Sequence, residues 1–232
     1  MLVKICGVKD VEAAQVALES GADMIGMIFV PGKPRTIQVS NAKEVVSLVE
    51  SKRKGLNSNE LYDSLKPGQD SLWFEQVHDS IKSNGPYSVG VFRNQSIEEI
   101  NNIIEEVDID FVQLHGQESH DEYIPQLKKP VITRFVPNET KVLQSLKPNK
   151  HLLPLFDSEA GGEGVKLNWS NLSDWSAKNN ARYLLAGGLT PDNVHEAIKL
   201  DGVIGVDVSG GVETNGVKDY VKIKEFVKNA LQ

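Results

Sequence analysis

Two glycine pairs near the end of the chain, Gly187-Gly188 and Gly210-Gly211, each follow a short apolar run. A turn without side chains after a buried strand lets backbone N–H groups approach an anion, and a phosphate suits that geometry. One pair alone would indicate no more than a turn. Two pairs separated by one helix and one strand match the loops that hold phosphate in (β/α)8 barrels. The sequence therefore favours a site for a phosphorylated small molecule.

Several other polar side chains end apolar runs or lie in the loops just beyond them: Cys6, Arg35, Arg93, Gln113, His115, Arg134 and Asp157. Side chains at the carboxyl ends of barrel strands face the catalytic mouth. A thiol and a carboxyl group placed there, Cys6 and Asp157, form a candidate acid–base pair. His115 is the only histidine expected at the mouth, and the sequence has no H-x-H or C-x-x-C spacing, so no metal site is expected.

Each of these residues also has a purely structural explanation. A lone cysteine is commonly a small buried hydrophobe, and an aspartate after a strand commonly caps the next segment. His115 is also compatible with a hydrogen-bonded histidine beside the mouth, and Arg35 with a solvated loop that Pro31 and Pro34 stiffen. The residue types indicate a phosphosugar-type barrel with a Cys/Asp pair, and they name no substrate.

The elements that must position these residues alternate along the chain. Continuous apolar runs, typical of parallel strands covered on both faces, occur at residues 3–6, 24–30, 87–92, 111–114, 131–135, 152–156, 183–186 and 203–208. Amphipathic helix patterns lie between them, at 11–20, 41–53, 97–107, 121–128, 140–146, 169–178, 191–200 and 217–231. Eight strand–helix units predict a closed (β/α)8 barrel, the TIM-barrel fold. The alternative is an open doubly wound sheet, whose usual G-x-G-x-x-G turn is missing after the first strand.

One polar stretch, residues 55–86, interrupts this alternation before the third strand. It contains one expected helix at 71–83, with Trp73, Phe74, Val77 and Ile81 on roughly one face. A helix-to-strand connection lies at the barrel face opposite the active site. We therefore expect a surface insertion packed down by its aromatic residues, with a docking or regulatory segment as the alternative.

The bulk composition is that of one globular domain spanning residues 1–232, with 40% hydrophobic and 25% charged residues. The net charge of −7 argues against a nucleic-acid partner. No apolar run is long enough to cross a membrane, and no secretory signal is visible. The single cysteine fits a reducing compartment, so the cytoplasm is expected. The outer helix faces look polar, which favours a monomer.

Seven segments together resemble the phosphoribosylanthranilate isomerase family of tryptophan biosynthesis: VKICGV, GMIFVPGKPRTI, VGVFRN, FVQLHG, PLFDSEAGGEG, LLAGGLTPDNV and GVDVSGGVETNGVKD. They cover nearly the whole chain in order, apart from residues 55–86. The resemblance implies a (β/α)8 barrel that works without a cofactor. It implies an Amadori rearrangement of N-(5-phosphoribosyl)anthranilate to 1-(2-carboxyphenylamino)-1-deoxyribulose 5-phosphate.

The resemblance also implies a role for each matching residue. Cys6 corresponds to the general base, Asp157 to the general acid, and Arg35 to the arginine that faces the anthranilate carboxylate. Gln113 and His115 correspond to residues that line the mouth. The phosphate cradle corresponds to Gly187, Gly188, Ser209, Gly210 and Gly211.

Three other functions remain open at this point. A related isomerase of histidine synthesis uses aspartates where this chain has Cys6. Indole-glycerol-phosphate synthase needs a catalytic lysine on the first strand, whereas Lys4 shares the face of Cys6 but lies deeper. A barrel that only binds a phosphorylated ligand is the third, and the presence of both Cys6 and Asp157 argues against it.

Overall fold

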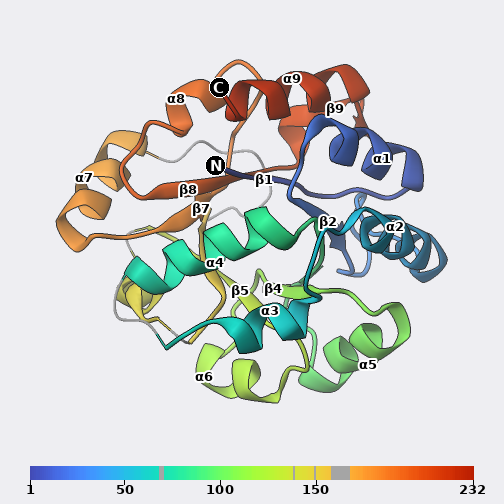
Figure 1. The fold of residues 1–232 in the computed structure, drawn as a ribbon, viewed down its shortest axis with the longest axis horizontal. Helices are drawn as coiled ribbons and strands as arrows, with labels where there is room; N and C mark the ends of the chain where they lie inside the picture. Colours follow the sequence, from blue (N-terminus) through green and yellow to red (C-terminus); the bar gives the residue numbers. More distant parts are fainter. Residues whose placement is uncertain (68–70, 138, 149, 158–167) are drawn as a thin grey trace.

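The computed structural model describes residues 1–67, 71–137, 139–148, 150–157 and 168–232. Within them, parallel strands β1 to β8 close into a barrel in sequence order (Figure 1). The strands are β1 (Leu2–Ile5), β2 (Met24–Ile28), β3 (Tyr87–Phe92), β4 (Phe111–Leu114), β5 (Val131–Phe135), β6 (Leu153–Phe156), β7 (Tyr183–Leu185) and β8 (Val203–Val208). Because β1 pairs with both β2 and β8, the sheet has no free edge. The predicted (β/α)8 barrel is confirmed, and the open doubly wound sheet is excluded.

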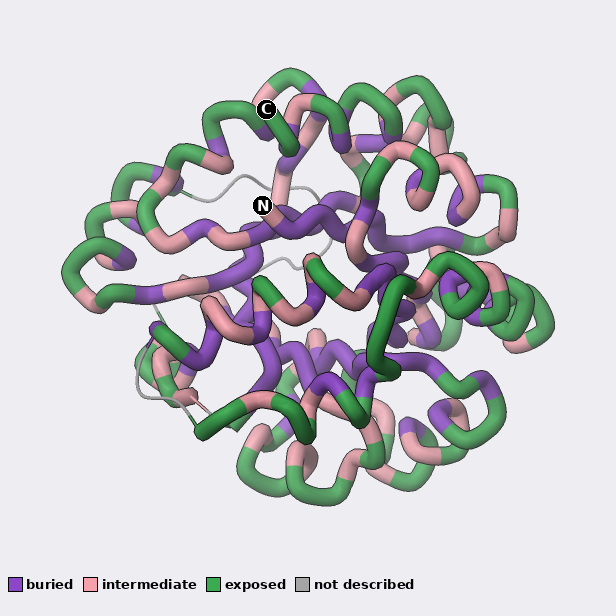
Figure 2. The backbone as a smooth tube through the Cα atoms, viewed as in Figure 1, coloured by how far each residue is buried: buried purple, intermediate pink, exposed green. Residues whose placement is uncertain are grey.

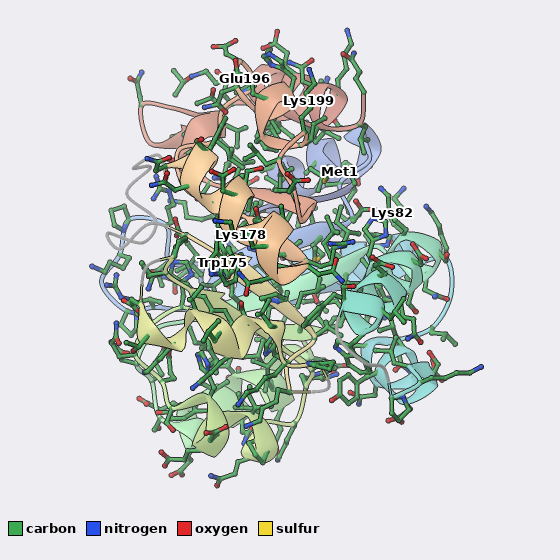
Figure 3. All side chains as sticks on the ribbon, turned by 90° about the vertical axis from the view of Figure 1, so that its left-hand side faces the viewer. Met1, Lys82, Trp175, Lys178, Glu196 and Lys199 are labelled. Atoms are coloured by element: carbon green, nitrogen blue, oxygen red, sulfur yellow. The ribbon has the colours of Figure 1, made fainter. Side chains whose placement is uncertain are left out.

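A ring of helices surrounds the strands (Figure 1): α1 (Val11–Ser20), α2 (Val39–Lys52), α5 (Ile97–Val107), α6 (His120–Tyr123), α7 (Trp169–Asn179), α8 (Val194–Ala197) and α9 (Tyr220–Ala230). Helix α5 shows how the sequence sets such an element. Ser96 and Glu99 form the capping box that starts it, and Ile100 and Ile104 bury its inner face. Buried stretches therefore face the strands and exposed ones face outward (Figure 2). Charged residues such as Lys178, Glu196 and Lys199 lie on the outside (Figure 3).

Four predicted helices differ from the observed ones. Residues 121–128 form the short α6 and a 3-10 turn, η1 (Ile124–Gln126), where Pro125 offers no N–H to continue an α-helix. Residues 140–146 form a 3-10 helix, η2 (Thr140–Leu146), and of residues 191–200 only α8 is α-helical. Residues 217–231 begin with β10 (Val217–Lys218), which forms a hairpin with the preceding β9 (Glu213–Thr214), and α9 starts only after it. The turn of this hairpin is Asn215-Gly216, both with positive φ (53° and 75°), which is the preferred two-residue hairpin turn.

The segment 55–86 contains two helices, α3 (Ser58–Ser64) and α4 (Ser71–Asn84), where the sequence predicted only the second. Asn57 and Glu60 form a capping box that starts α3, so its signal was present in the sequence. Helix α4 runs across the centre of the molecule in Figure 1, inside the ring of outer helices. Its buried side chains are Trp73, Phe74, Val77 and Ile81.

These α4 side chains join the apolar cluster at the amino ends of the strands. The cluster includes the first residues of five strands: Leu2, Met24, Tyr87, Phe111 and Leu153. A second, larger cluster lies between the strands and the outer helices. The amino end of the barrel is thus closed by apolar packing, which leaves the carboxyl end for the polar side chains.

Candidate active site

A cavity of about 690 Å³ opens at the carboxyl ends of the strands. All the site residues predicted from the sequence line it: Cys6, Arg35, Gln113, His115, Asp157, Gly187, Gly188, Ser209, Gly210 and Gly211. Arg93 lines it as well, whereas Arg134, which was also expected at the mouth, is not one of the described residues that line it. Residues from seven different strand ends or following loops therefore meet in one space, as the barrel topology requires.

Cys6 follows β1 and is only 6% exposed, so its thiol lies in the wall of the cavity. Burial raises the pKa of the Cys6 thiol above its ordinary value, and the nearby Lys4 ammonium opposes part of that rise. Lys4 is fully buried beneath it and donates to Asp207 Oδ1 at 2.9 Å. This position does not suit a catalytic lysine at the mouth, which argues against the synthase alternative.

Asp157 follows β6 on another side of the cavity and is 2% exposed. His115 Nε2 lies 3.3 Å from Asp157 Oδ2, and His115 Nδ1 lies 3.1 Å from the amide nitrogen of Gln113. When the Gln113 amide donates to Nδ1, the imidazole proton is on Nε2 and faces the carboxylate. Gln113 therefore contacts His115, and His115 contacts Asp157. This series of contacts can keep a proton next to the Asp157 carboxylate.

Arg35 reaches the mouth from the loop after β2, where Glu213 of the β9–β10 hairpin holds it. Its Nε and Nη2 donate to the two Glu213 oxygens at 2.8 and 2.9 Å. Lys218, 5% exposed on the same hairpin, donates to Glu213 Oε1 at 2.8 Å and to the Ser209 carbonyl at 2.9 Å. Although burial alone would raise the pKa of Glu213, these two cations lower it below the ordinary value.

Three further residues lie beside the site and were not predicted from the sequence: Glu213, Lys218 and Asp207. The Asn-Gly turn was the available signal for the first two, because it predicts a hairpin directly after the second glycine pair. Asp207 was detectable by alternation, since it lies two residues before Ser209 on the same face of β8. Both signals place side chains at or just below the mouth.

The glycine turns have a backbone conformation in which residues other than glycine would be strained. Gly187 and Gly188 have φ of 86° and 68°, in the left-handed region. A Cβ on Gly211 would lie 1.8 Å from the Leu189 carbonyl oxygen, so the turns after β7 and β8 are in close contact. Their backbones form one continuous wall of the cavity beside Ser209.

Within the described part of the chain, no three His, Cys, Asp or Glu side chains converge as metal ligands do. None of the helices described there is long and apolar enough to cross a membrane.

Comparisons with known proteins agree with this geometry. The model of the family described as N-(5'-phosphoribosyl)anthranilate (PRA) isomerase matches residues 66–229. Among curated proteins, the N-(5'-phosphoribosyl)anthranilate isomerase of Komagataella pastoris is 46% identical over 99% of both chains. That of Saccharomyces cerevisiae is 44% identical over 99% of this chain and 94% of its own. The chain belongs to the PRA isomerase family.

Solved structures of PRA isomerases have the same fold. Monomers generated from the dimeric enzyme of Thermotoga maritima match with a TM-score of 0.71 and 28% identity, over 100% of this chain and 99% of theirs. A PRA isomerase in complex with reduced 1-(o-carboxyphenylamino)-1-deoxyribulose 5-phosphate matches with a TM-score of 0.69, 28% identity and the same coverage. The family, the fold and the isomerase activity predicted from the sequence are confirmed.

Proposed function

We propose that the cavity isomerises N-(5'-phosphoribosyl)anthranilate by general acid–base catalysis, with Asp157 as the acid and Cys6 as the base. The observation that carries this assignment is their placement. The thiol and the carboxyl group come from β1 and β6, yet both line one cavity together with a cation and two glycine turns. A sugar phosphate bound across this space has a proton donor and a proton acceptor at hand.

The acid step opens the ribose ring. Asp157 donates a proton to the ring oxygen as the bond from that oxygen to C1′ breaks, and a Schiff base forms with the anthranilate nitrogen. His115 is a positioning residue in this step, because its Nε2 lies within 3.3 Å of the Asp157 carboxylate. Gln113 in turn orients the imidazole through Nδ1.

The base step removes the C2′ proton, which the Schiff base has made acidic. The Cys6 thiolate takes this proton, and the resulting enolamine tautomerises to the ketone. No redox change occurs in either step, so the residues already present account for the proton transfers.

The two ends of the substrate are held by different parts of the cavity. The turns containing Gly187, Gly188, Ser209, Gly210 and Gly211 are proposed to bind the phosphate through backbone N–H groups. Arg35 is proposed to bind the anthranilate carboxylate from the loop after β2, beside Gly210. Binding both ends fixes the sugar between acid and base, which reduces the entropy that the reaction must lose.

Two substitutions test the assignment. Asp157→Asn and Cys6→Ser keep the size of each side chain, and each is expected to lower kcat by at least ~10²-fold because proton transfer is lost. Turnover is measured by the fluorescence of the anthranilate group in a coupled assay. Binding of a reduced product analogue, followed by calorimetry, should be retained in both variants. Near-normal kcat in either variant would remove that residue from its role.

We also propose a monomer that works in the cytoplasm. A catalytic thiol fits a reducing compartment. The large apolar side chains exposed on the described surface are scattered over several elements, apart from Val217, Tyr220 and Val221, and three neighbours fall short of the roughly 800 Å² per partner of a stable interface. Sedimentation at a mass well above 25.6 kDa would contradict the monomer.

A further inference from the structure

A buried ion pair lies directly beneath Cys6 and has no part in the acid–base steps described above. Lys4 on β1 and Asp207 on β8 are register partners on adjacent strands, which Figure 1 shows side by side. Lys4 Nζ donates to Asp207 Oδ1 at 2.9 Å, and the two side chains are 0% and 8% exposed. Substrate in the cavity cannot touch Lys4, because the ammonium group is fully enclosed.

The position of the ammonium group is set by its neighbours below the thiol. Gly26 of β2 leaves a gap beside both side chains: a Cβ there would lie 2.8 Å from Cys6 Sγ and 3.1 Å from Lys4 Nζ. The sulfur and the nitrogen therefore border the same small space inside the barrel. Across this space the Lys4 ammonium and the Cys6 thiol interact, each shifting the pKa of the other toward its charged form.

A stabilising role alone does not explain this pair. Two charges buried in a barrel lose their hydration, and well-packed apolar residues of similar size are commonly as stable or more so. Burial by itself would lower the pKa of Lys4, but Asp207 and Cys6 outweigh that effect and raise it. Lys4 is therefore an ammonium ion, held beneath a sulfur atom that must become negatively charged.

We propose that Lys4 is a positioning residue for the general base: held by Asp207, its ammonium group donates to Cys6 Sγ and stabilises the thiolate. This inference rests on the proposed role of Cys6 in proton removal. Asp207 keeps the lysine charged and in place, while Gly26 provides the room in which sulfur and nitrogen meet.

Other charged groups face the thiol from the surrounding elements. Lys218 of β10 also favours the thiolate, and Asp207 of β8 opposes it. Arg35, in the loop after β2, interacts with Cys6 as well. All three cations are paired, Arg35 and Lys218 with Glu213 and Lys4 with Asp207. Lys4 opposes the rise in the Cys6 pKa more strongly than Lys218 does. We therefore expect Lys4 to have the largest single effect on ionisation of the thiol.

The test is a titration of the only cysteine in the chain. Ultraviolet absorbance of the thiolate is recorded against pH for the wild type and for Lys4→Met, with Cys6→Ser as the blank that removes the tyrosine signal. Lys4→Met is expected to raise the pKa of the thiol by about one unit or more, since the compensating ammonium is lost. Lys129→Met, at a residue paired with Asp108 beyond the opposite end of the barrel, is the matched control and should leave the titration unchanged.

Kinetics give the second measurement. At neutral pH, kcat/KM of Lys4→Met is expected to fall about tenfold for each unit of thiol pKa, with little change in KM. The difference in kcat/KM between Lys4→Met and the wild type should shrink as the pH rises above the thiol pKa of both proteins. A general loss of structure would lower the rate at every pH, so recovery at high pH separates the two causes.

Lys4→Met leaves Asp207 buried without its partner and can therefore fold poorly. A second variant keeps the test decisive in that case. Lys4→Met/Asp207→Asn removes both charges, and its thiol pKa should still exceed that of the wild type. Equal thiol titrations in all folded variants, or a rate deficit independent of pH, would overturn the role of Lys4. Failure of Cys6 as the base is a separate outcome, because an active Cys6→Ser variant would show it while the titration still decides what Lys4 does.

Discussion

Arg35 illustrates how one residue at the mouth depends on another that is remote in sequence. The Glu213 carboxylate accepts from both Nε and Nη2 of Arg35, and this pairing raises the pKa of the guanidinium further above its already high value. A bidentate partner fixes the plane of the guanidinium group before the substrate arrives. Glu213 thus orients Arg35 at the side of the cavity next to Gly210.

Arg35→Ala is expected to raise KM, or to lower kcat/KM, by roughly tenfold or more, the effect of losing one charge-assisted contact with the anthranilate carboxylate. Glu213→Gln keeps Arg35 and loosens it, so a smaller change in the same direction is expected. Lys43→Ala, on the exposed face of α2, is the control. Steady-state kinetics check all three, and wild-type constants for Arg35→Ala would exclude it from substrate binding.

The lining of the cavity could be predicted from the sequence, but its internal contacts could not. Strand ends reveal which side chains reach the mouth, because the barrel topology brings them together. The partners of Lys4 and Arg35 are 203 and 178 residues away along the chain. Such pairings depend on closure of β8 onto β1 and on the fold of the hairpin, and no local pattern contains them.

At the scale of elements, α4 is attached to the barrel through His151. Trp73 Nε1 donates to the His151 carbonyl at 3.1 Å, and the Phe74 ring stacks on the imidazole at 5.5 Å. His151 is 3% exposed, and burial lowers its pKa to about 3. The imidazole in this contact is therefore neutral at neutral pH.

This contact predicts acid sensitivity. Because the pKa of His151 is lower in the folded chain than in the unfolded one, its contribution to stability is complete above about pH 6.5 and declines as the pH falls toward 3, by about 1.4 kcal/mol for each pH unit. His120 and Lys150 are the charged neighbours, and burial lowers the pKa of His120 too. His151→Phe keeps the stacking and should flatten the pH dependence relative to the wild type.

Urea unfolding at a series of pH values, followed by tryptophan fluorescence, measures this effect. His195→Gln serves as control because that imidazole is 52% exposed. The same slope of unfolding free energy against pH in the wild type and in His151→Phe would show that His151 is not responsible.

The elements themselves were predictable to different degrees. The eight strands and the capped helices, such as α5, carry strong local signals in apolar runs and capping residues. The 3-10 segment η2 and the short α6 and α8 were overestimated, since amphipathic spacing alone does not distinguish one helical turn from several. The hairpin β9–β10 was missed because the apolar pattern of α9 was extended backward over its second strand.

At the scale of the whole molecule, chemistry and packing occupy opposite ends of the barrel. The polar cavity is built from loops that follow the strands, whereas α4 covers the ends at which the strands begin. In this fold, contacts at the amino ends serve stability and those at the carboxyl ends serve catalysis. Substitutions at the two ends should therefore affect different measurable quantities.

Trp73→Ala tests this separation. Trp73 is 3% exposed and packs edge-on against Tyr62 of α3 at 6.0 Å, so its loss opens a cavity and frees the His151 carbonyl. We expect the free energy of unfolding to fall by about 3 kcal/mol or more, while kcat/KM stays within a few-fold of the wild type below the unfolding transition. Leu72→Ala, at the adjacent position with a side chain 61% exposed, is the matched control, with a change of less than about 0.5 kcal/mol. If Trp73→Ala stayed fully folded at the assay temperature yet lost most of its activity, α4 would have to act on the mouth through the barrel interior, and the two ends would not be independent.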